Sequence, residues 1–297
     1  MLSSESFKKV SFVLEIVVFF IKISAYLAVS GAVLFSETLH SLADVFDSMF
    51  IYIGFRLSRR RPDPQHPFGY GKETFFWALV TAIFMVAVTA TLSIVKGVNQ
   101  LLAPEPLHHL GFGLFSMAIG IVLSLVTLAM GLMVIAGGRG LSFRTFQAFL
   151  DPSVKVKVAE DVASVLGNLL AMLALFLYNI SGSTVYDAAA ALLVGVLLAY
   201  LGFMMAAESK DLIIGRSVSR SRRKKIRRAA LSVKGVVKVM DLKTMLLGPD
   251  ELLVNIEVNL VDGLDTDKVE QVIDRVRAEI ELKVPEARHI QVEAESG

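Results

Sequence analysis

The chain has 297 residues, of which 54% are hydrophobic and 20% are charged, and its mean hydropathy of +0.62 is far above that of an ordinary soluble domain. This excess predicts that much of the chain faces lipid. The absence of cysteine excludes disulfides, thiolate metal sites and thiol catalysis, so a metal ligand must be histidine, carboxylate, amide or water.

Six apolar segments are predicted to be membrane helices, because a bilayer core about 30 Å thick needs roughly 20 apolar helical residues. No signal-peptide cleavage site follows the first segment, so we expect that helix to be retained. Together the six segments predict a transmembrane domain over residues 1–210. They are Phe12–Val33, Ser36–Arg56, Thr74–Val95, Leu110–Ala136, Val158–Tyr178 and Val185–Ala206.

Lysine and arginine are concentrated before the first segment and in the loops after the second and fourth, whereas the alternate loops hold almost none. The positive-inside rule therefore predicts that both termini are cytoplasmic. We expect a multi-pass protein of the plasma membrane. The residues behind this orientation are Lys8, Lys9, Arg56, Arg59, Arg60, Arg61, Lys72, Arg139, Arg144, Lys155 and Lys157.

Residues 216–297 are predicted to form a separate cytoplasmic α+β domain, because charges become frequent and apolar residues recur in short periodic runs. The order is α-β-β-α-β, with Thr266 as the cap of the second helix. A single-layer sheet of this size often associates through its open face, so we expect a homodimer. The elements are Ser219–Ser232, Val236–Leu247, Leu252–Val261, Asp267–Lys283 and His289–Glu293.

The first of these helices lies in the strongly basic stretch 216–228. Its position just inside the membrane favours a role in topology and contact with anionic lipid headgroups over nucleic-acid binding.

The second membrane segment carries Glu37, His40, Asp44 and Asp47 at spacings of 3, 4 and 3, which place them on one helix face. Ionisable groups at membrane depth cost several kcal/mol unless they are paired or hydrated, so they usually mark a substrate or proton path. The structural alternative is an interhelical hydrogen-bond seam or, for Glu37 and Asp47, snorkelling to an interface.

A His-Asp pair at i and i+4 supplies two metal ligands, so another helix must supply more. The fifth segment offers Glu160 and Asp161, and Asp161, Ser164 and Asn168 share one face. The structural alternative is that these acids only pair with Lys157. Glu15 and Lys22 of the first segment are expected to pair with neighbours inside the bundle.

Two motifs in order resemble the cation diffusion facilitator family. The first is SETLHSLADVFDS at Ser36–Ser48 and the second is RRRPDPQHPFGYGKE at Arg59–Glu73. The run EDVASVLGNLLA at 160–171 is similar to the fifth helix of one branch of that family, and the α-β-β-α-β order resembles its cytoplasmic domain. The resemblance implies export of zinc, manganese, iron or cobalt from the cytoplasm by proton antiport.

By that resemblance, His40, Asp44 and Asp161 are ligands of the transport site. Lys157 occupies the position from which the zinc members usually supply a fourth ligand, and a cation cannot bind metal, so Glu160 is the predicted replacement, with Ser164, Asn168 or water as alternatives. Zinc is the first expectation for the transported ion, with manganese, iron or cobalt as alternatives, and no permanent cofactor is expected.

The resemblance also suggests a second, cytoplasmic metal site at Asp63 and His66, although Tyr70 replaces its third ligand. The alternative is that Asp63 and His66 only shape their loop. In the C-terminal domain the histidine-rich site of the family has no counterpart, because the matching places hold carboxylates: Asp241, Glu257, Glu293 and Glu295.

These residues together predict a secondary transporter that exchanges a divalent metal for protons by alternating access. Hydrolase, metalloprotease and phosphate-binding motifs are absent from the sequence, so we do not expect an enzyme. Two rivals stay open: a membrane metal-binding scaffold or regulator that no longer transports, for which Lys157 is the best argument, and an intramembrane enzyme with paired carboxylates.

Overall fold

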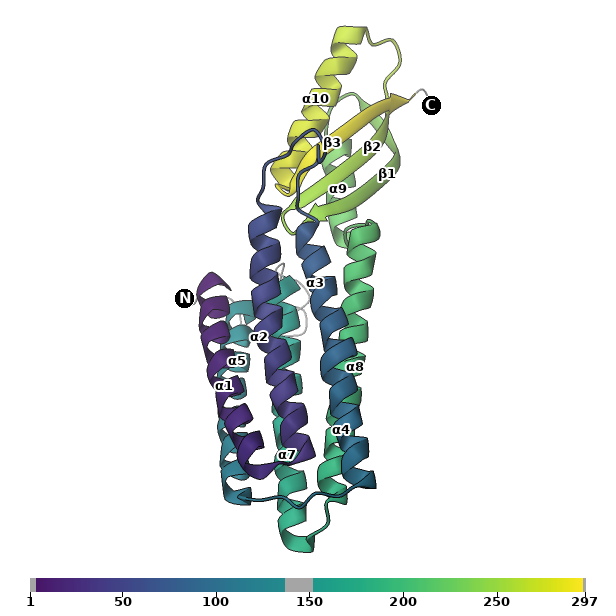
Figure 1. Ribbon diagram of the computed structural model, residues 1–297. Coiled ribbons are helices and arrows are strands. Elements are labelled where there is room, and N and C mark those ends of the chain that lie inside the picture. Colours follow the sequence, from purple (N-terminus) through teal and green to yellow (C-terminus); the bar gives the residue numbers. More distant parts are fainter. Residues whose placement is uncertain (1–3, 137–151, 296–297) are drawn as a thin grey trace. The chain divides into compact units, whose positions relative to one another are not determined.

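The computed structural model describes residues 4–136 and 152–295 (Figure 1), so Arg139 and Arg144, which entered the orientation prediction, lie outside the described residues. Its N-terminal part consists of long helices, and its C-terminal part is an α+β domain, as predicted. The helices before the C-terminal domain are α1 (Ser4–Val29), α2 (Ala32–Ser58), α3 (Glu73–Phe84), η1 (Met85–Ala90), α4 (Thr91–Leu102), α5 (Leu110–Ala136), α7 (Pro152–Ser181) and α8 (Val185–Ile214).

The boundary between the first two helices differs from the prediction, because α1 ends at Val29 and α2 already begins at Ala32. Ser30 breaks the helix with a positive φ of 63°. The buried carboxylate of Asp187, in the first turn of α8, accepts hydrogen bonds from the backbone N–H groups of Ala32 (2.7 Å) and Val33 (3.0 Å). A carboxylate satisfies the free donors of a helix N-terminus and its positive dipole end, so Asp187 fixes where α2 starts.

The third predicted span is one helical segment over residues 73–102, in which the π-helical turn η1 lies between α3 and α4. Among the described residues, five helices are long and apolar enough to cross a membrane: Lys9–Val29, Glu73–Leu102, Leu110–Ala136, Lys157–Ser181 and Val185–Ile214. Helix α2 has 27 residues, which is sufficient length, but its carboxylates lower its mean hydropathy. Its burial among the other helices explains how such a polar helix is accommodated.

Small and apolar side chains hold the helices together. Helix α5 packs along both α1 and α7. The buried cluster combines alanines with larger residues of α1, α2, η1, α5, α7 and α8, including Ala25, Leu34, Met117, Leu175 and Leu198. This packing places the polar face of α2 beside α7.

The C-terminal domain has a three-stranded sheet in the order β1-β2-β3, where β1 and β2 are antiparallel and β2 and β3 are parallel. The buried side chains of β2, including Val254 and Ile256, form a core with Ile226 of α9 and Val276 of α10. The predicted cap was wrong by one residue: the side chain of Asp265, not Thr266, accepts the N–H of Lys268. The elements are α9 (Arg220–Leu231), β1 (Val236–Gly248), β2 (Glu251–Leu260), α10 (Thr266–Lys283) and β3 (Ala287–Glu295).

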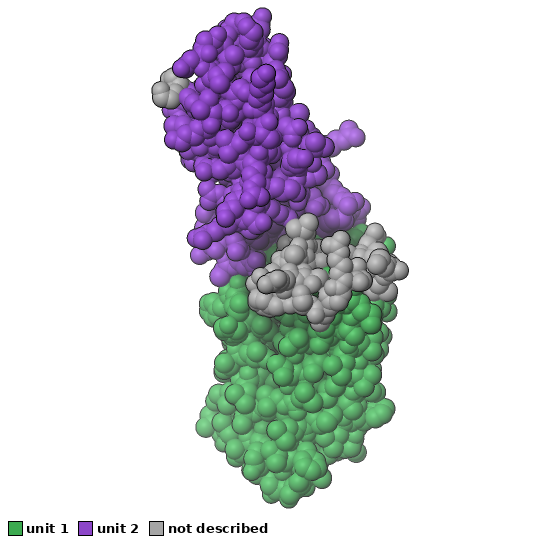
Figure 2. Space-filling model, turned by 180° about the vertical axis from the view of Figure 1, so that it is seen from behind, with its two compact units in different colours: residues 1–52, 78–206 green, residues 53–77, 207–297 purple. Residues whose placement is uncertain are grey.

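The chain divides into two compact units, residues 1–52 with 78–206, and residues 53–77 with 207–297 (Figure 2). The second unit therefore includes the loop between α2 and α3. Within it, a Cβ added to Gly71 would lie 2.5 Å from the carbonyl oxygen of Leu247, and Lys72 Nζ donates a hydrogen bond of 3.0 Å to the carbonyl of Ile213. The loop thus packs directly on β1 and the end of α8.

Candidate functional site

The polar face of α2 is buried as the spacing predicted. His40 is 1% exposed and Asp44 7%, and His40 Nε2 lies 3.7 Å from Asp44 Oδ1, one helical turn away. No hydrogen bond to the described residues is made by His40 Nδ1 or Asp44 Oδ1. A buried imidazole and carboxylate with free atoms on adjacent turns form the kind of donor pair that a divalent metal uses.

Helix α7 faces this pair through Ser164. Its hydroxyl lies 3.4 Å from His40 Nε2 and 3.4 Å from Asp44 Oδ2. Asn168, one turn further along, donates to the backbone carbonyl of Ser164 at 2.6 Å and leaves its own side-chain oxygen unpartnered among the described residues. The predicted shared face of α7 therefore meets α2 through Ser164.

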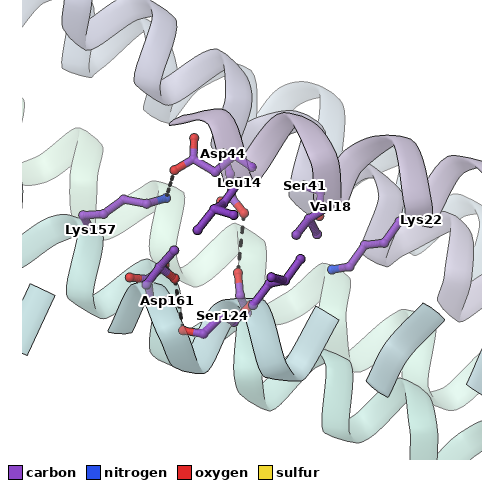
Figure 3. Close-up of a pocket in the computed structure, with 12 residues that line it drawn as sticks. Leu14, Val18, Lys22, Ser41, Asp44, Ser124, Lys157 and Asp161 are labelled. Carbon is purple, nitrogen blue, oxygen red and sulfur yellow. Dashed lines mark hydrogen bonds and ion pairs between the residues drawn. The ribbon is translucent and has the colours of Figure 1, made fainter. Parts of the chain in front are cut away.

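Asp161 lines the same pocket as Asp44, between α1, α2, α5 and α7 (Figure 3). Its Oδ1 accepts a 2.9 Å hydrogen bond from Thr127 of α5, whereas Oδ2 has no partner among the described residues. The pocket is small, with a cavity volume of about 20 Å³, enough for about one water molecule. Its lining comprises Leu14, Glu15, Val18, Lys22, Ser41, Asp44, Leu123, Ser124, Thr127, Lys157, Asp161 and Ser164.

Lys157 reaches into this pocket and forms an ion pair of 2.7 Å with Glu15 of α1 and one of 3.4 Å with Glu160. Ser48 of α2 donates a hydrogen bond of 2.7 Å to the other oxygen of Glu15. Glu160 is thus tied to Lys157, the pairing expected for it in the structural alternative, and it is not among the residues that line the pocket.

Glu37 is fully buried in an ion pair of 2.7 Å with Lys22 of α1. The expectation that Glu15 and Lys22 pair with neighbours inside the bundle is therefore confirmed. Because its charge is already neutralised by a lysine, Glu37 joins α1 to α2 as part of a polar seam.

The predicted ligands are not gathered into a metal-binding cluster in this conformation. Within residues 4–136 and 152–295, no group of three or more His, Asp or Glu side chains is placed so that it could hold one metal ion. The structure brings together His40, Asp44 and Ser164, and it places Asp161 on the wall of the pocket that Asp44 and Ser164 also line.

The candidate cytoplasmic site at Asp63 and His66 is an exposed, internally hydrogen-bonded loop. Asp63 Oδ1 accepts the backbone N–H groups of Gln65 and His66, and His66 Nδ1 lies 3.3 Å from the same oxygen. Tyr70 donates a 2.6 Å hydrogen bond to Asp63 Oδ2, which lowers the pKa of Asp63 and raises the pKa of Tyr70. Both carboxylate oxygens therefore already shape the loop.

The carboxylates predicted at the family's C-terminal metal position form a row across the sheet, because Asp241 is in register with Glu257 and Glu257 with Glu293. Lys243 lies 2.8 Å from Asp241 and 3.8 Å from Glu257. Hydrogen bonding to Lys243 lowers the pKa of Asp241. This row is thus partly neutralised by a lysine of the same sheet.

Sequence reasoning missed Asp187 as a cap and Glu15 as the partner of Lys157. The first partner is 155 residues from Ala32 and the second pair is separated by a comparable stretch of chain, so no local pattern announces either contact. The sequence offered one signal for these contacts: a charged side chain inside a membrane domain is costly in free energy, so it needs a partner.

Comparisons with known proteins identify a family. The family description "Cation efflux transmembrane domain" matches residues 9–214, and "Cation efflux protein, cytoplasmic domain" matches residues 218–296. The proton-coupled zinc antiporter SLC30A9, mitochondrial, of Xenopus laevis is 29% identical over 270 residues, which are 87% of this chain and 48% of that protein. The chain therefore spans about half the length of that relative.

The cation-efflux pump FieF of Yersinia enterocolitica is 24% identical over 275 residues, covering 93% of this chain and 87% of the pump. The solved structure "MamM-CTD 215-293" is 19% identical with a TM-score of 0.25, covering 26% of this chain and 96% of that one. Because the two family matches cover nearly the whole chain and the transmembrane match alone covers most of it, the chain belongs to the cation diffusion facilitator family.

Proposed function

We propose that the protein is a secondary transporter that moves a divalent transition metal out of the cytoplasm. The observation that carries this proposal is the buried pair of His40 and Asp44 beside Ser164, next to a pocket that Asp44, Ser164 and Asp161 line together. His40, Asp44 and Asp161 each keep a buried atom that has no hydrogen-bond partner among the described residues, and buried polar groups without a role are rare.

We place Zn²⁺ first as substrate because the imidazole of His40 favours zinc, and we keep Mn²⁺, Fe²⁺ and Co²⁺ as alternatives because the carboxylate-rich remainder of the site suits manganese or iron. Zinc also appears in the name of the SLC30A9 relative. Metal binding needs a neutral histidine and ionised carboxylates, so protons and metal compete for the same atoms. This competition would couple the two fluxes, and it supports our proposal of proton antiport by alternating access.

In the metal-bound state, Asp161 has to approach His40 and Asp44, since the three are not clustered in the present conformation. Glu160 is the proposed fourth ligand and must first leave Lys157. Ser164 is the alternative, because its hydroxyl already lies near both α2 residues. A second site at Asp63 and His66 would similarly require Asp63 to release Tyr70.

For the whole protein, we propose a transmembrane domain over residues 1–210, a cytoplasmic domain over 216–297, cytoplasmic termini, a plasma-membrane location and a homodimer formed by the C-terminal domain. The match to a cytoplasmic domain at residues 218–296 supports the orientation. A monomeric mass by light scattering of the full chain in detergent would contradict the dimer.

The test is uptake of Zn²⁺, Mn²⁺, Fe²⁺ and Co²⁺ by vesicles that contain the purified full chain, with and without a pH gradient. We expect gradient-dependent uptake that His40→Ala and Asp44→Ala reduce to the level of protein-free vesicles. Ser36→Ala is the matched control, because Ser36 is buried on the same helix and donates only to its own backbone at Ala32.

Unchanged uptake in Asp44→Ala would show that Asp44 is not a ligand of the transport site. Metal binding by the native chain without flux would instead select the scaffold or regulator.

A further inference from the structure

A lysine side chain lines the pocket beside the proposed transport site, although its positive charge does not help to bind a metal cation. Lys157 lines it together with Glu15, Asp44 and Asp161, and its side chain is only 11% exposed. Figure 3 shows Lys157 and Asp161 directed into this one pocket from α7. A fixed positive charge so close to a binding site for M²⁺ opposes binding through like-charge repulsion.

Glu15 determines where this ammonium lies. It binds Lys157 at 2.7 Å with one oxygen, while Ser48 of α2 holds the other oxygen at 2.7 Å. The other buried carboxylates that interact electrostatically with Lys157 include Glu160, Asp44, Asp161 and Asp47. Without Glu15, the ammonium would be left among these carboxylates of the described helices, and Asp44, Asp161 and Glu160 are proposed metal ligands.

We propose that Lys157 is a charge-tuning residue of the transport site, whose ammonium weakens metal binding and speeds release, and that Glu15 is the positioning residue that keeps it off Asp44 and Asp161. This inference rests on the proposed function. It differs from a structural role of the ion pair in one respect: the two partners act on metal affinity in opposite directions.

Lys157→Gln removes the positive charge and leaves Glu15 in the pocket, so the Kd for Zn²⁺ should fall by about tenfold or more. Uptake should then show a lower KM and a lower maximal rate, because the metal leaves more slowly. Glu15→Gln leaves the ammonium free to pair with Asp44 and Asp161, so the Kd should rise by about tenfold.

The double variant Glu15→Gln/Lys157→Gln removes both charges and should have a Kd between those of the single variants. Lys157→Arg keeps the charge and should bind zinc as the native chain does. Lys157→Gln could fail to fold because Glu15 is left buried and unpaired. In that case, a Kd for Zn²⁺ that is higher in Glu15→Gln than in the native chain, and lower in the double variant than in Glu15→Gln, supports the proposal.

The measurements are isothermal titration of the full chain in detergent with Zn²⁺ and initial rates of Zn²⁺ uptake into vesicles. Opposite shifts of Kd in the two single variants support the assignment. Weaker binding in both single variants of a transporting protein would reduce the pair to structural support and overturn the inference, while the proposed function would stand. Absence of zinc binding and flux in the native chain would overturn the proposed function itself.

Discussion

Buried charges in the described part of the bundle have specific partners: Lys22 pairs with Glu37, Lys157 with Glu15, and Asp187 with two backbone N–H groups. Removing one member of such a pair leaves the other charge or donor unsatisfied in a medium without water, which costs more than the interaction itself contributes. The loss of stability in a single variant at these residues therefore includes the cost of a buried, unpaired group as well as the loss of the contact.

Asp187→Ala removes the acceptor of both N–H groups at the start of α2 and should lower the free energy of unfolding by about 1–3 kcal/mol. The measurement is thermal unfolding of the full chain in detergent. Asp211→Ala is the control, because Asp211 lies on the same helix with its side chain 58% exposed. Equal melting temperatures for the two variants would contradict the capping role.

The hydrogen bond between Tyr70 and Asp63 predicts an alkaline titration. Because the carboxylate raises the pKa of Tyr70 above 10.0, the bond is intact below that pH and is lost as the pH rises through the raised pKa. The absorbance difference between the native chain and Tyr70→Phe should show this midpoint, and Asp63→Asn should move it to lower pH. An unmoved midpoint in Asp63→Asn would show that Asp63 does not control Tyr70.

At the scale of elements, the loop between α2 and α3 and strand β1 approach so closely that only glycine fits at position 71. An added Cβ would lie 2.5 Å from the carbonyl oxygen of Leu247 and 3.0 Å from the Cα of Gly248. Both neighbours are backbone atoms, so the strain can be relieved only by a shift of the loop or the strand.

Gly71→Ala should therefore destabilise the second compact unit by about 1–3 kcal/mol, and limited proteolysis should cut the loop or the β1–β2 turn sooner than in the native chain. Gly111→Ala is the matched control, since no heavy atom outside its own helix backbone and chain neighbours lies within 4 Å of the added Cβ. Equal proteolysis rates for the two variants would mean that the contact contributes nothing to stability.

Hydropathy and spacing were sufficient to predict the long helices, the α-β-β-α-β order and the buried stripe of α2, because each is a local pattern. The end of α1, the cap at Asp187 and the partner of Lys157 depend on side chains far along the chain, and the sequence offers no period for them. The metal-ligand set could be predicted only in part from local sequence patterns. His40 and Asp44 follow from one helix, whereas the approach of Asp161 depends on how α7 packs.

At the scale of the whole molecule, the described membrane helices expose apolar side chains and bury polar ones, the reverse of a protein in water. Large apolar side chains such as Phe20, Leu27 and Phe203 are more than half exposed, while His40, Asp44 and Lys22 are buried. In water such a surface would drive aggregation, but in a bilayer it is already solvated. Polar interactions among buried side chains therefore supply specificity to the packing.

The close contact of Gly71 with β1 also has a consequence for synthesis. The loop leaves the ribosome long before its partner strand, which follows about 180 residues later and so roughly 10–35 s later at about 5–20 residues per second. During that interval α2 and α3 can insert, and the end of α8 is made before β1, but the loop around Gly71 still lacks its partner strand. Completion of β1 is thus the event that provides the contact at Gly71, and a chain interrupted before Leu247 would leave this part of the loop exposed to proteases.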